Sequence, residues 1–324
     1  MTDPRLPQAS LPVSTRAPGK CILFGEHAVV HGQPELLLAI DLHTQVTIAR
    51  SVQGSTRLNA DPAARETNPY FRRALERRWT SGESLDVTAT SRIPRSAGLG
   101  SSAAFVAGLT AGLSTLSGPV PTETLAQDCF TIEREAQGVG SPGDTSASVA
   151  GGYVALNSEA GTLLWQVAAD SQSWTVRRVV DPGWVWVVAY TGIPRSTPDA
   201  VRAFADRVQQ HDGPALLERF SQVASSGIDA VRDENREETG RWMIRNQELL
   251  RDSGVSHPRL EALLEAVRPS VVGSKLTGAG RGGSIVALPL GGKELETSRR
   301  IARVGGVPYV VRPAKTGVSV VGHA

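Results

Sequence analysis

Cysteines are scarce in this sequence, and long apolar runs are missing from it. The chain of 324 residues has only Cys21 and Cys129, whose spacing matches no metal-binding pattern. No secretory signal is recognisable, and no apolar stretch is long enough to cross a membrane. We therefore expect two buried thiols in a protein of the reducing cytoplasm, without a membrane partner.

An excess of charge of either sign is also lacking. The 34 basic and 32 acidic residues give a net charge of +2, which offers no reason to expect a nucleic-acid partner. Hydrophobic residues make up 40% and charged residues 20% of the chain, as in soluble globular proteins. The length exceeds that of a usual single core, so we expect two domains.

The sequence contains no Walker A phosphate loop, but it has another glycine-rich turn. Residues 94–104 read Pro-Arg-Ser-Ala-Gly-Leu-Gly-Ser-Ser-Ala-Ala and run into an apolar helical stretch at 105–116. Gly98 and Gly100 allow positive φ and close approach of a ligand. Unpaired N–H groups of residues 101–104 at the helix start favour a bound phosphate. The alternative is a plain turn before a core helix.

The order of the elements predicts an α+β protein with two layered domains. Asp181-Pro-Gly precedes a strongly apolar strand and is the best boundary, which gives domains at 13–182 and 183–324. Helices are expected at 105–116, at 122–137 with Thr122 as the cap, in several stretches between 198 and 267, and at 293–304. Strands are expected at 21–24, 36–39, 45–49, 85–89, 152–157, 163–167, 184–190, 284–288, near 309 and at 317–321.

A second segment concentrates chemistry in a strand and turn. Residues 17–32 read Ala-Pro-Gly-Lys-Cys-Ile-Leu-Phe-Gly-Glu-His-Ala-Val-Val-His-Gly, which places Lys20, Glu26 and His27 within eight residues. These side chains would otherwise be surface residues of a β-hairpin. A third segment, 275–283, reads Lys-Leu-Thr-Gly-Ala-Gly-Arg-Gly-Gly.

In order and spacing, these three segments resemble the three motifs of the GHMP kinases, over nearly the full chain. The run Gly25-Glu-His-Ala-Val-Val-His-Gly is similar to the mevalonate kinase branch of that family, as are 191–197 and 254–258. The resemblance implies an N-terminal domain like ribosomal protein S5 domain 2 and a ferredoxin-like C-terminal domain. It also implies an ATP site in the cleft between them.

A fourth region resembles the part of these kinases that holds magnesium and acts on the acceptor. Glu133 precedes Asp144 by eleven residues, which matches the family spacing of a Mg²⁺ ligand and a residue that acts on the substrate hydroxyl. The usual Ser-Gly-Ile/Val-Asp reads Ser141-Pro-Gly-Asp here, and Arg281 replaces a glycine of the third motif. Both departures bear on substrate recognition more than on phosphoryl transfer.

The expected roles divide the site into three groups. Lys20 would stabilise the forming alkoxide beside Asp144, which either removes the proton or orients the hydroxyl. Ser102 and Glu133 would supply oxygen ligands to Mg²⁺. The residues expected at the ATP phosphates are Pro94, Gly98, Leu99, Gly100, Ser101, Ser102, Ala103, Ala104, Gly278 and Gly280.

On the acceptor side, the resemblance points to Glu26 and His27, and Arg195 offers a bidentate site for a carboxylate. A histidine that satisfies a turn and a surface arginine are the alternatives. The expected reaction is ATP-dependent phosphorylation of the 5-hydroxyl of mevalonate, a step of isoprenoid biosynthesis. The residues do not decide between a monomer and a homodimer.

Three other functions fit parts of the pattern. A phosphomevalonate kinase would need additional cationic side chains for the acceptor phosphate. A diphosphomevalonate decarboxylase would lack the Gly-Glu-His run at 25–27. A catalytically silent sensor would have lost Lys20, Glu133 or Asp144, and all three are present.

Overall fold

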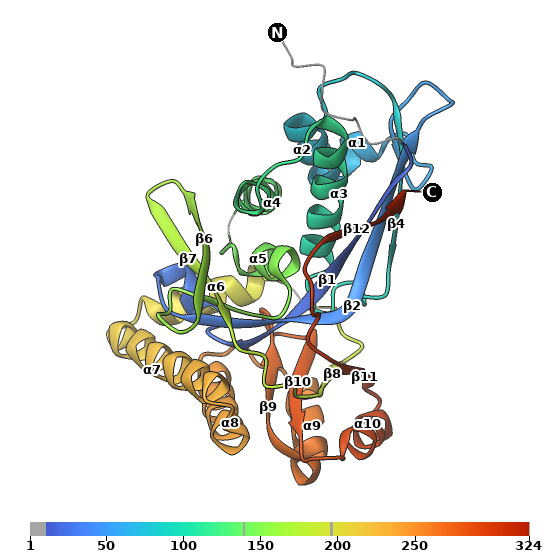
Figure 1. Cartoon of the computed structure of the whole chain (residues 1–324). Helices are drawn as coiled ribbons and strands as arrows, with labels where there is room; N and C mark the ends of the chain where they lie inside the picture. The colour runs from blue at the N-terminus through green and yellow to red at the C-terminus, as the bar shows by residue number, and fades with distance from the viewer. Residues whose placement is uncertain (1–10, 139, 195–196, 324) are drawn as a thin grey trace.

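The computed structural model describes the backbone of residues 11–138, 140–194 and 197–323, and the side chains of these residues except 197–199, 322 and 323. Two sheets of different size organise this part of the chain (Figure 1). Helices cover both sheets, and the long strands at the centre of the view connect the upper and lower halves of the molecule.

The larger sheet has eight strands and is built on a long hairpin of β1 (Val13–Phe24) and β2 (Glu35–Arg50). The two strands pair antiparallel along most of their length, with Cys21 opposite Leu38. The main path of this sheet runs β12-β1-β2-β5-β7-β6, while β4 pairs with β2 and β3 with β4. Its other strands are β3 (Arg57–Leu58), β4 (Leu85–Ser91), β5 (Tyr153–Leu156), β6 (Thr162–Ala169), β7 (Gln172–Val179) and β12 (Ser319–His323).

Helices pack on one face of the large sheet, with α3 lying against β1 and β2. Gly108 of α3 allows this close approach, because a Cβ there would lie 3.1 Å from Cγ2 of Val46. The Thr15 hydroxyl donates to the Gly108 carbonyl at 2.8 Å and fixes the contact. The helices of this layer are α1 (Ala64–Thr67), α2 (Pro69–Arg78), α3 (Ser101–Ser117), α4 (Thr122–Gln137) and α5 (Gly143–Ala150).

The smaller sheet has four antiparallel strands in the order β11-β8-β10-β9. In chain order this is strand, helices, two strands, helix, strand, which is the ferredoxin-like arrangement. Its strands are β8 (Trp186–Tyr190), β9 (Val271–Thr277), β10 (Ser284–Pro289) and β11 (Val307–Val311).

Four helices follow β8, and a fifth lies between β10 and β11. The amphipathic helix α7 reaches back to the first hairpin, where Gly227 lies against the Phe24 ring. These helices are α6 (Thr197–Val208), α7 (Gly213–Arg232), α8 (Arg236–Asp252), α9 (Pro258–Val267) and α10 (Glu294–Arg303). Short 3₁₀ turns are η1 (Ala28–His31) and η2 (Arg268–Ser270).

The expected α+β class and the ferredoxin-like second part are confirmed. The division into 13–182 and 183–324 stays a prediction: the sheets change between β7 and β8, but β12 returns to the large sheet beside β1. Among the described residues, no helix is long and apolar enough to span a membrane. Both cysteines are free and buried as predicted, and burial raises the pKa of each thiol to about 12.

The predicted cap of the helix at 122–137 is wrong. Pro121, with ψ of 147°, is the non-helical residue before α4, and Thr122 is already its first helical residue. The Thr122 side chain therefore stands in the first turn instead of bonding to its free N–H groups.

Candidate active site

Lys20 and Asp144 form an ion pair at the centre of the site. Lys20 is fully buried on β1, and its Nζ lies 2.9 Å from Oδ1 of Asp144. The same Nζ donates to the Gly98 carbonyl at 3.2 Å. Asp144 is in the first turn of α5, where the helix dipole favours a carboxylate, and its side chain is 25% exposed. The expected pair therefore exists, with its open side at Asp144.

The phosphate loop lies directly against this pair. Gly98 and Gly100 have φ of 83° and 75°, as the sequence predicted. A Cβ on Gly100 would lie 2.8 Å from Cγ of Lys20, so the loop can approach the lysine only with glycine there. The expectation that the Ala104 N–H is unpaired is wrong, because this N–H donates to the Gly100 carbonyl at 2.9 Å. Since Gly100 is the N-cap, the donors that precede the helical ladder are those of residues 100–103.

Ser102 and Glu133 come together across the interface of α3 and α4. The Ser102 hydroxyl donates to Oε1 of Glu133 at 3.0 Å, and Gln137 Nε2 donates to the same oxygen at 3.0 Å. Glu133 is 7% exposed. Mg²⁺ bound with nucleotide phosphates uses one or two carboxylates and keeps waters, so these hard oxygens fit it. Within the described ranges, no group of three or more His, Cys, Asp or Glu side chains forms a protein-only metal cage.

The turn after β1 connects to the third motif, in the other sheet. His27 has φ of 62°, its Nε2 makes a 2.9 Å hydrogen bond with the Ala279 carbonyl, and its ring stacks on Phe204 with centroids 5.0 Å apart. Glu26 is fully buried in an ion pair with Lys275. Burial raises the pKa of Glu26 and lowers that of Lys275, and the attraction between them opposes both shifts.

The glycine-rich third motif lines the pocket at one residue and packs on the backbone of Val255 at two others. Gly278 lines the pocket together with His27, and its expected contact with the ATP phosphates stays a prediction. Gly280, with φ of 83°, packs on the backbone of Val255, and a Cβ there would overlap the Val255 carbonyl. Arg281 also has positive φ, at 54°, and its N–H donates to the same carbonyl at 2.7 Å. The arginine thus adopts a left-handed backbone conformation, which glycine adopts more readily.

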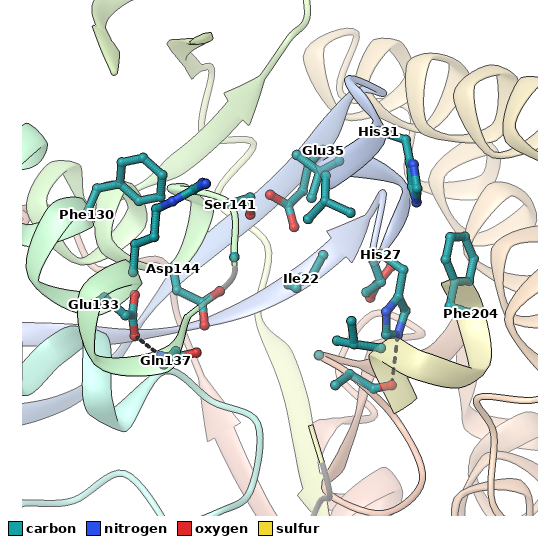
Figure 2. Close-up of a pocket in the computed structure, with 18 of the residues that line it drawn as sticks. Ile22, His27, His31, Glu35, Phe130, Glu133, Gln137, Ser141, Asp144 and Phe204 are labelled. Carbon is teal, nitrogen blue, oxygen red and sulfur yellow. Dashed lines mark hydrogen bonds between the residues drawn. The ribbon is translucent and has the colours of Figure 1, made fainter. Parts of the chain in front are cut away.

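Figure 2 shows the pocket on which these segments converge, with Asp144 and Glu133 on one wall and His27 and Phe204 on the other. Of the predicted catalytic, acceptor and metal residues, Lys20, Glu26, His27, Glu133 and Asp144 all line it. Ser102 adjoins it through Glu133. Arg195 lies outside the described residues, so its expected contact with the acceptor stays a prediction.

Sequence reasoning missed two charged residues of the site. Lys275 was treated only as the start of a glycine motif, although its ammonium group neutralises Glu26. Glu35, at the start of β2, is 2% exposed and lines the pocket. Burial and the nearby Asp144 charge raise the pKa of Glu35 well above its usual value. The one available signal was a carboxylate directly before the apolar run 36–40.

Models of known families match both halves of the chain. The model described as "GHMP kinases N terminal domain" matches residues 68–152, and that described as "GHMP kinases C terminal" matches residues 228–304. The chain belongs to the GHMP kinase family. The predicted resemblance is thereby confirmed, and with it the expectation of a kinase.

Several of the similar proteins are named mevalonate kinase, which is one branch of the family. A mevalonate kinase of Methanothermobacter thermautotrophicus is 33% identical, covering 85% of this chain and 89% of its own. A mevalonate kinase of Pyrococcus abyssi is 31% identical over 98% of both chains. The crystal structure of L. major mevalonate kinase in complex with R-mevalonate superposes with a TM-score of 0.79 at 22% identity, covering 98% of this chain and all of the other. The last comparison bears on the fold alone.

Proposed function

We propose that this kinase transfers the γ-phosphoryl group of ATP to the 5-hydroxyl of (R)-mevalonate. The observation that carries the proposal is the contact of Lys20 with both Asp144 and the phosphate loop. It places a cation between a carboxylate that faces the acceptor pocket and the backbone donors that suit phosphate oxygens. The relatives named mevalonate kinase, at about 30% identity over most of the chain, support mevalonate as the acceptor.

In this reaction the protein mainly positions groups and stabilises charge. The 5-hydroxyl binds at the exposed edge of Asp144, which accepts its hydrogen bond and takes its proton. The hydroxyl oxygen bonds to the γ-phosphorus while the bond from that phosphorus to the β,γ-bridging oxygen breaks, and ADP leaves. Lys20 stabilises the oxygen as it becomes an alkoxide. The backbone N–H donors of residues 100–103 hold the phosphates in line with the hydroxyl. Pro94 and Leu99 belong to the same phosphate loop, and Gly278 and Gly280 belong to the third motif on the opposite side of the phosphates.

Ser102 and Glu133 are the residues that would hold Mg²⁺ together with the ATP phosphates. The ion supplies charge neutralisation for the phosphates when it is bound. The Ser102 hydroxyl donates to Glu133, so the two oxygens already lie close together. We expect Glu133→Gln to raise the Mg²⁺ concentration needed for half-maximal turnover at least about tenfold. An unchanged metal titration would remove Glu133 from this role.

His27 and Glu26 form the acceptor wall in this proposal. His27 is fixed by Ala279 and Phe204, and Glu26 by Lys275, so the turn is rigid before substrate binds. We assign residues 13–182 and 183–324 as the two domains and the cytoplasm as the compartment. The retained ion pair between Lys20 and Asp144 favours an enzyme over a silent sensor.

An assay of ADP release with Mg-ATP tests the proposal, using mevalonate, 5-phosphomevalonate, galactose and homoserine as acceptors. We expect turnover with mevalonate at least about a hundredfold above the other three. Equal or faster turnover with 5-phosphomevalonate would assign the later phosphorylation instead. ATP binding without turnover of any acceptor would favour the sensor.

A further inference from the structure

The mechanism proposed above leaves one buried acid of the pocket unused. Glu35 begins β2, close to the turn that carries Glu26 and His27. Its side chain is almost fully buried, and its Oε2 has no hydrogen-bond partner in the part of the chain that the structure describes. Figure 2 shows the Glu35 carboxyl on the pocket wall, facing the side that holds Ser141 and Asp144. An unpaired buried carboxyl oxygen is costly, so a partner from the ligand would compensate.

The chain makes room for this carboxyl at Gly143. A Cβ on Gly143 would overlap Oε2 of Glu35 and lie 3.2 Å from both methyl groups of Leu37. Gly143 is also the position where the motif quoted above usually has Ile or Val. The two features are therefore coupled, since a carboxyl fills space that a branched side chain at 143 would need.

The charges around Glu35 indicate which kind of ligand group it suits. Burial raises the pKa of Glu35 most, and the Asp144 and Glu26 charges raise it further, while Lys20 and a hydrogen bond from Ser141 lower it; the pKa ends well above its usual value. The carboxyl is therefore a neutral acid over a wider pH range than usual, and it can both donate and accept a hydrogen bond. A carboxylate of the acceptor at this point would be repelled by the nearby Asp144 charge, whereas an uncharged hydroxyl would not.

We propose that Glu35 is a specificity-determining residue whose carboxyl group hydrogen-bonds the 3-hydroxyl of mevalonate while Asp144 holds the 5-hydroxyl. This inference rests on the proposed function. It gives the pocket separate contacts for the two hydroxyl groups of one acceptor. Discrimination then arises because an acceptor without the 3-hydroxyl leaves the Glu35 carboxyl unpaired.

The test compares mevalonate with 5-hydroxy-3-methylpentanoate, which lacks the 3-hydroxyl. For the wild type we expect kcat/KM to be at least about tenfold higher with mevalonate. Glu35→Met, of similar length and without hydrogen-bonding atoms, should reduce this preference to within about threefold and leave the KM for ATP unchanged. Glu35→Gln, which keeps donor and acceptor atoms, should retain most of the preference.

Leu38→Ala on the same strand is the control for packing, because Leu38 is buried and does not line the pocket. It should lower stability without changing the preference. An unchanged preference in Glu35→Met, with normal wild-type activity, would overturn the inference alone. Absence of wild-type turnover with mevalonate would overturn the proposed function and this inference with it. If Glu35→Met does not fold, Glu35→Ala, which also lacks hydrogen-bonding atoms, takes its place: loss of the preference supports the contact, and an unchanged preference contradicts it.

Discussion

Two buried residues, Lys20 and Lys275, show how single charges build this site. Each ammonium group is fully buried and each has a carboxylate partner, Asp144 for the first and Glu26 for the second. Only Asp144 keeps a side open to the pocket, with a quarter of its side chain exposed. The same pairing therefore yields a reactive group in one case and a structural link in the other.

Replacing Asp144 tests the reactive pair. We expect Asp144→Asn to reduce kcat at least about a hundredfold and to leave ATP affinity within about threefold, because the amide cannot accept the proton. Steady-state kinetics and nucleotide titration measure the two effects. Asp86→Asn is the matched control, since Asp86 pairs with Arg57 on β3 and does not line the pocket. Near-normal turnover of Asp144→Asn would remove this residue from the chemistry.

Glu35 also predicts a pH dependence of stability. Its pKa is raised on folding, so the folded state binds more protons than the unfolded state at pH above the ordinary value of 4.5. The stability contributed by this proton is complete below that pH and is lost as the pH rises toward the folded pKa. Glu35→Gln removes the titration.

We therefore expect Glu35→Gln to gain stability relative to the wild type as the pH rises above about 5, and to show the smallest difference near pH 4. Urea denaturation at a series of pH values measures this. The exposed Glu83, paired with Arg50 across the surface, gives a control in Glu83→Gln that should show no such trend. A difference that grows toward low pH would contradict the assignment.

At the residue scale, the motifs could be predicted because the residues of each motif lie close together in the sequence. The roles of Lys20, Glu133 and Asp144 follow from the resemblance of their segments to those of the GHMP kinases, and the structure places all three at one pocket. Lys275 and Glu35 were missed because their partners are remote: Lys275 pairs with a residue 249 positions away. No local pattern records such a contact.

At the scale of elements, the start of α5 determines how Asp144 is presented. Gly143 lies on Glu35 and Leu37 of β2, so the helix begins in contact with the sheet. We expect Gly143→Val to destabilise the protein by about 1–3 kcal/mol, because two branched carbons must enter occupied space. Turnover should fall as well, since the next residue is Asp144.

A double-mutant cycle checks this contact. Glu35→Ala should relieve the clash, so the double variant should be more stable than the sum of the two single effects by about 1 kcal/mol or more. Gly291→Val, at a position with no atom near the added Cβ, is the control and should show no coupling with Glu35→Ala. Additive effects of the first two substitutions would contradict the packing described here.

Helices and strands with a strong hydrophobic periodicity were predicted with nearly correct bounds. Where the periodicity is interrupted, the predicted strands are shorter than the observed ones. The expected strands at 36–39 and 45–49 form one strand, β2, which continues through Asp41 and His43. His43 stays in the sheet opposite Pro18 of β1, and the Asp41 N–H, at a register shift of this pairing, donates to the Arg312 carbonyl at 3.1 Å. Pairing across the sheet, which the sequence does not display, overrides the local break.

At the scale of the whole molecule, several contacts among the described residues connect the two sheets around the site. Lys275 pairs with Glu26, the Ile22 N–H donates to the Thr277 hydroxyl at 2.7 Å, and the Ser284 hydroxyl donates to the Ala97 carbonyl at 2.7 Å. Because they join β1 and the phosphate loop to β9 and β10, the pocket is complete only when both sheets are in place.

The buried pair between the sheets can be tested by denaturation. Lys275→Met should lower the free energy of unfolding by about 3–5 kcal/mol, because Glu26 would remain buried without its partner. Adding Glu26→Leu should recover much of this loss. Lys293→Met, which breaks an exposed pair with Glu296, should cost less than about 1 kcal/mol. A loss that the second substitution does not reduce would argue against a coupled pair.

The central claim is that Asp144 and Lys20 direct phosphorylation to the 5-hydroxyl of mevalonate. The most direct test is NMR identification of the product formed from Mg-ATP and (R)-mevalonate by the wild type and by Asp144→Asn. We predict one product, with phosphorus coupled to the protons on C5, and at least a hundredfold slower formation by the variant. Phosphate at another oxygen, no phosphorylated mevalonate, or equal rates for the two proteins would contradict the account.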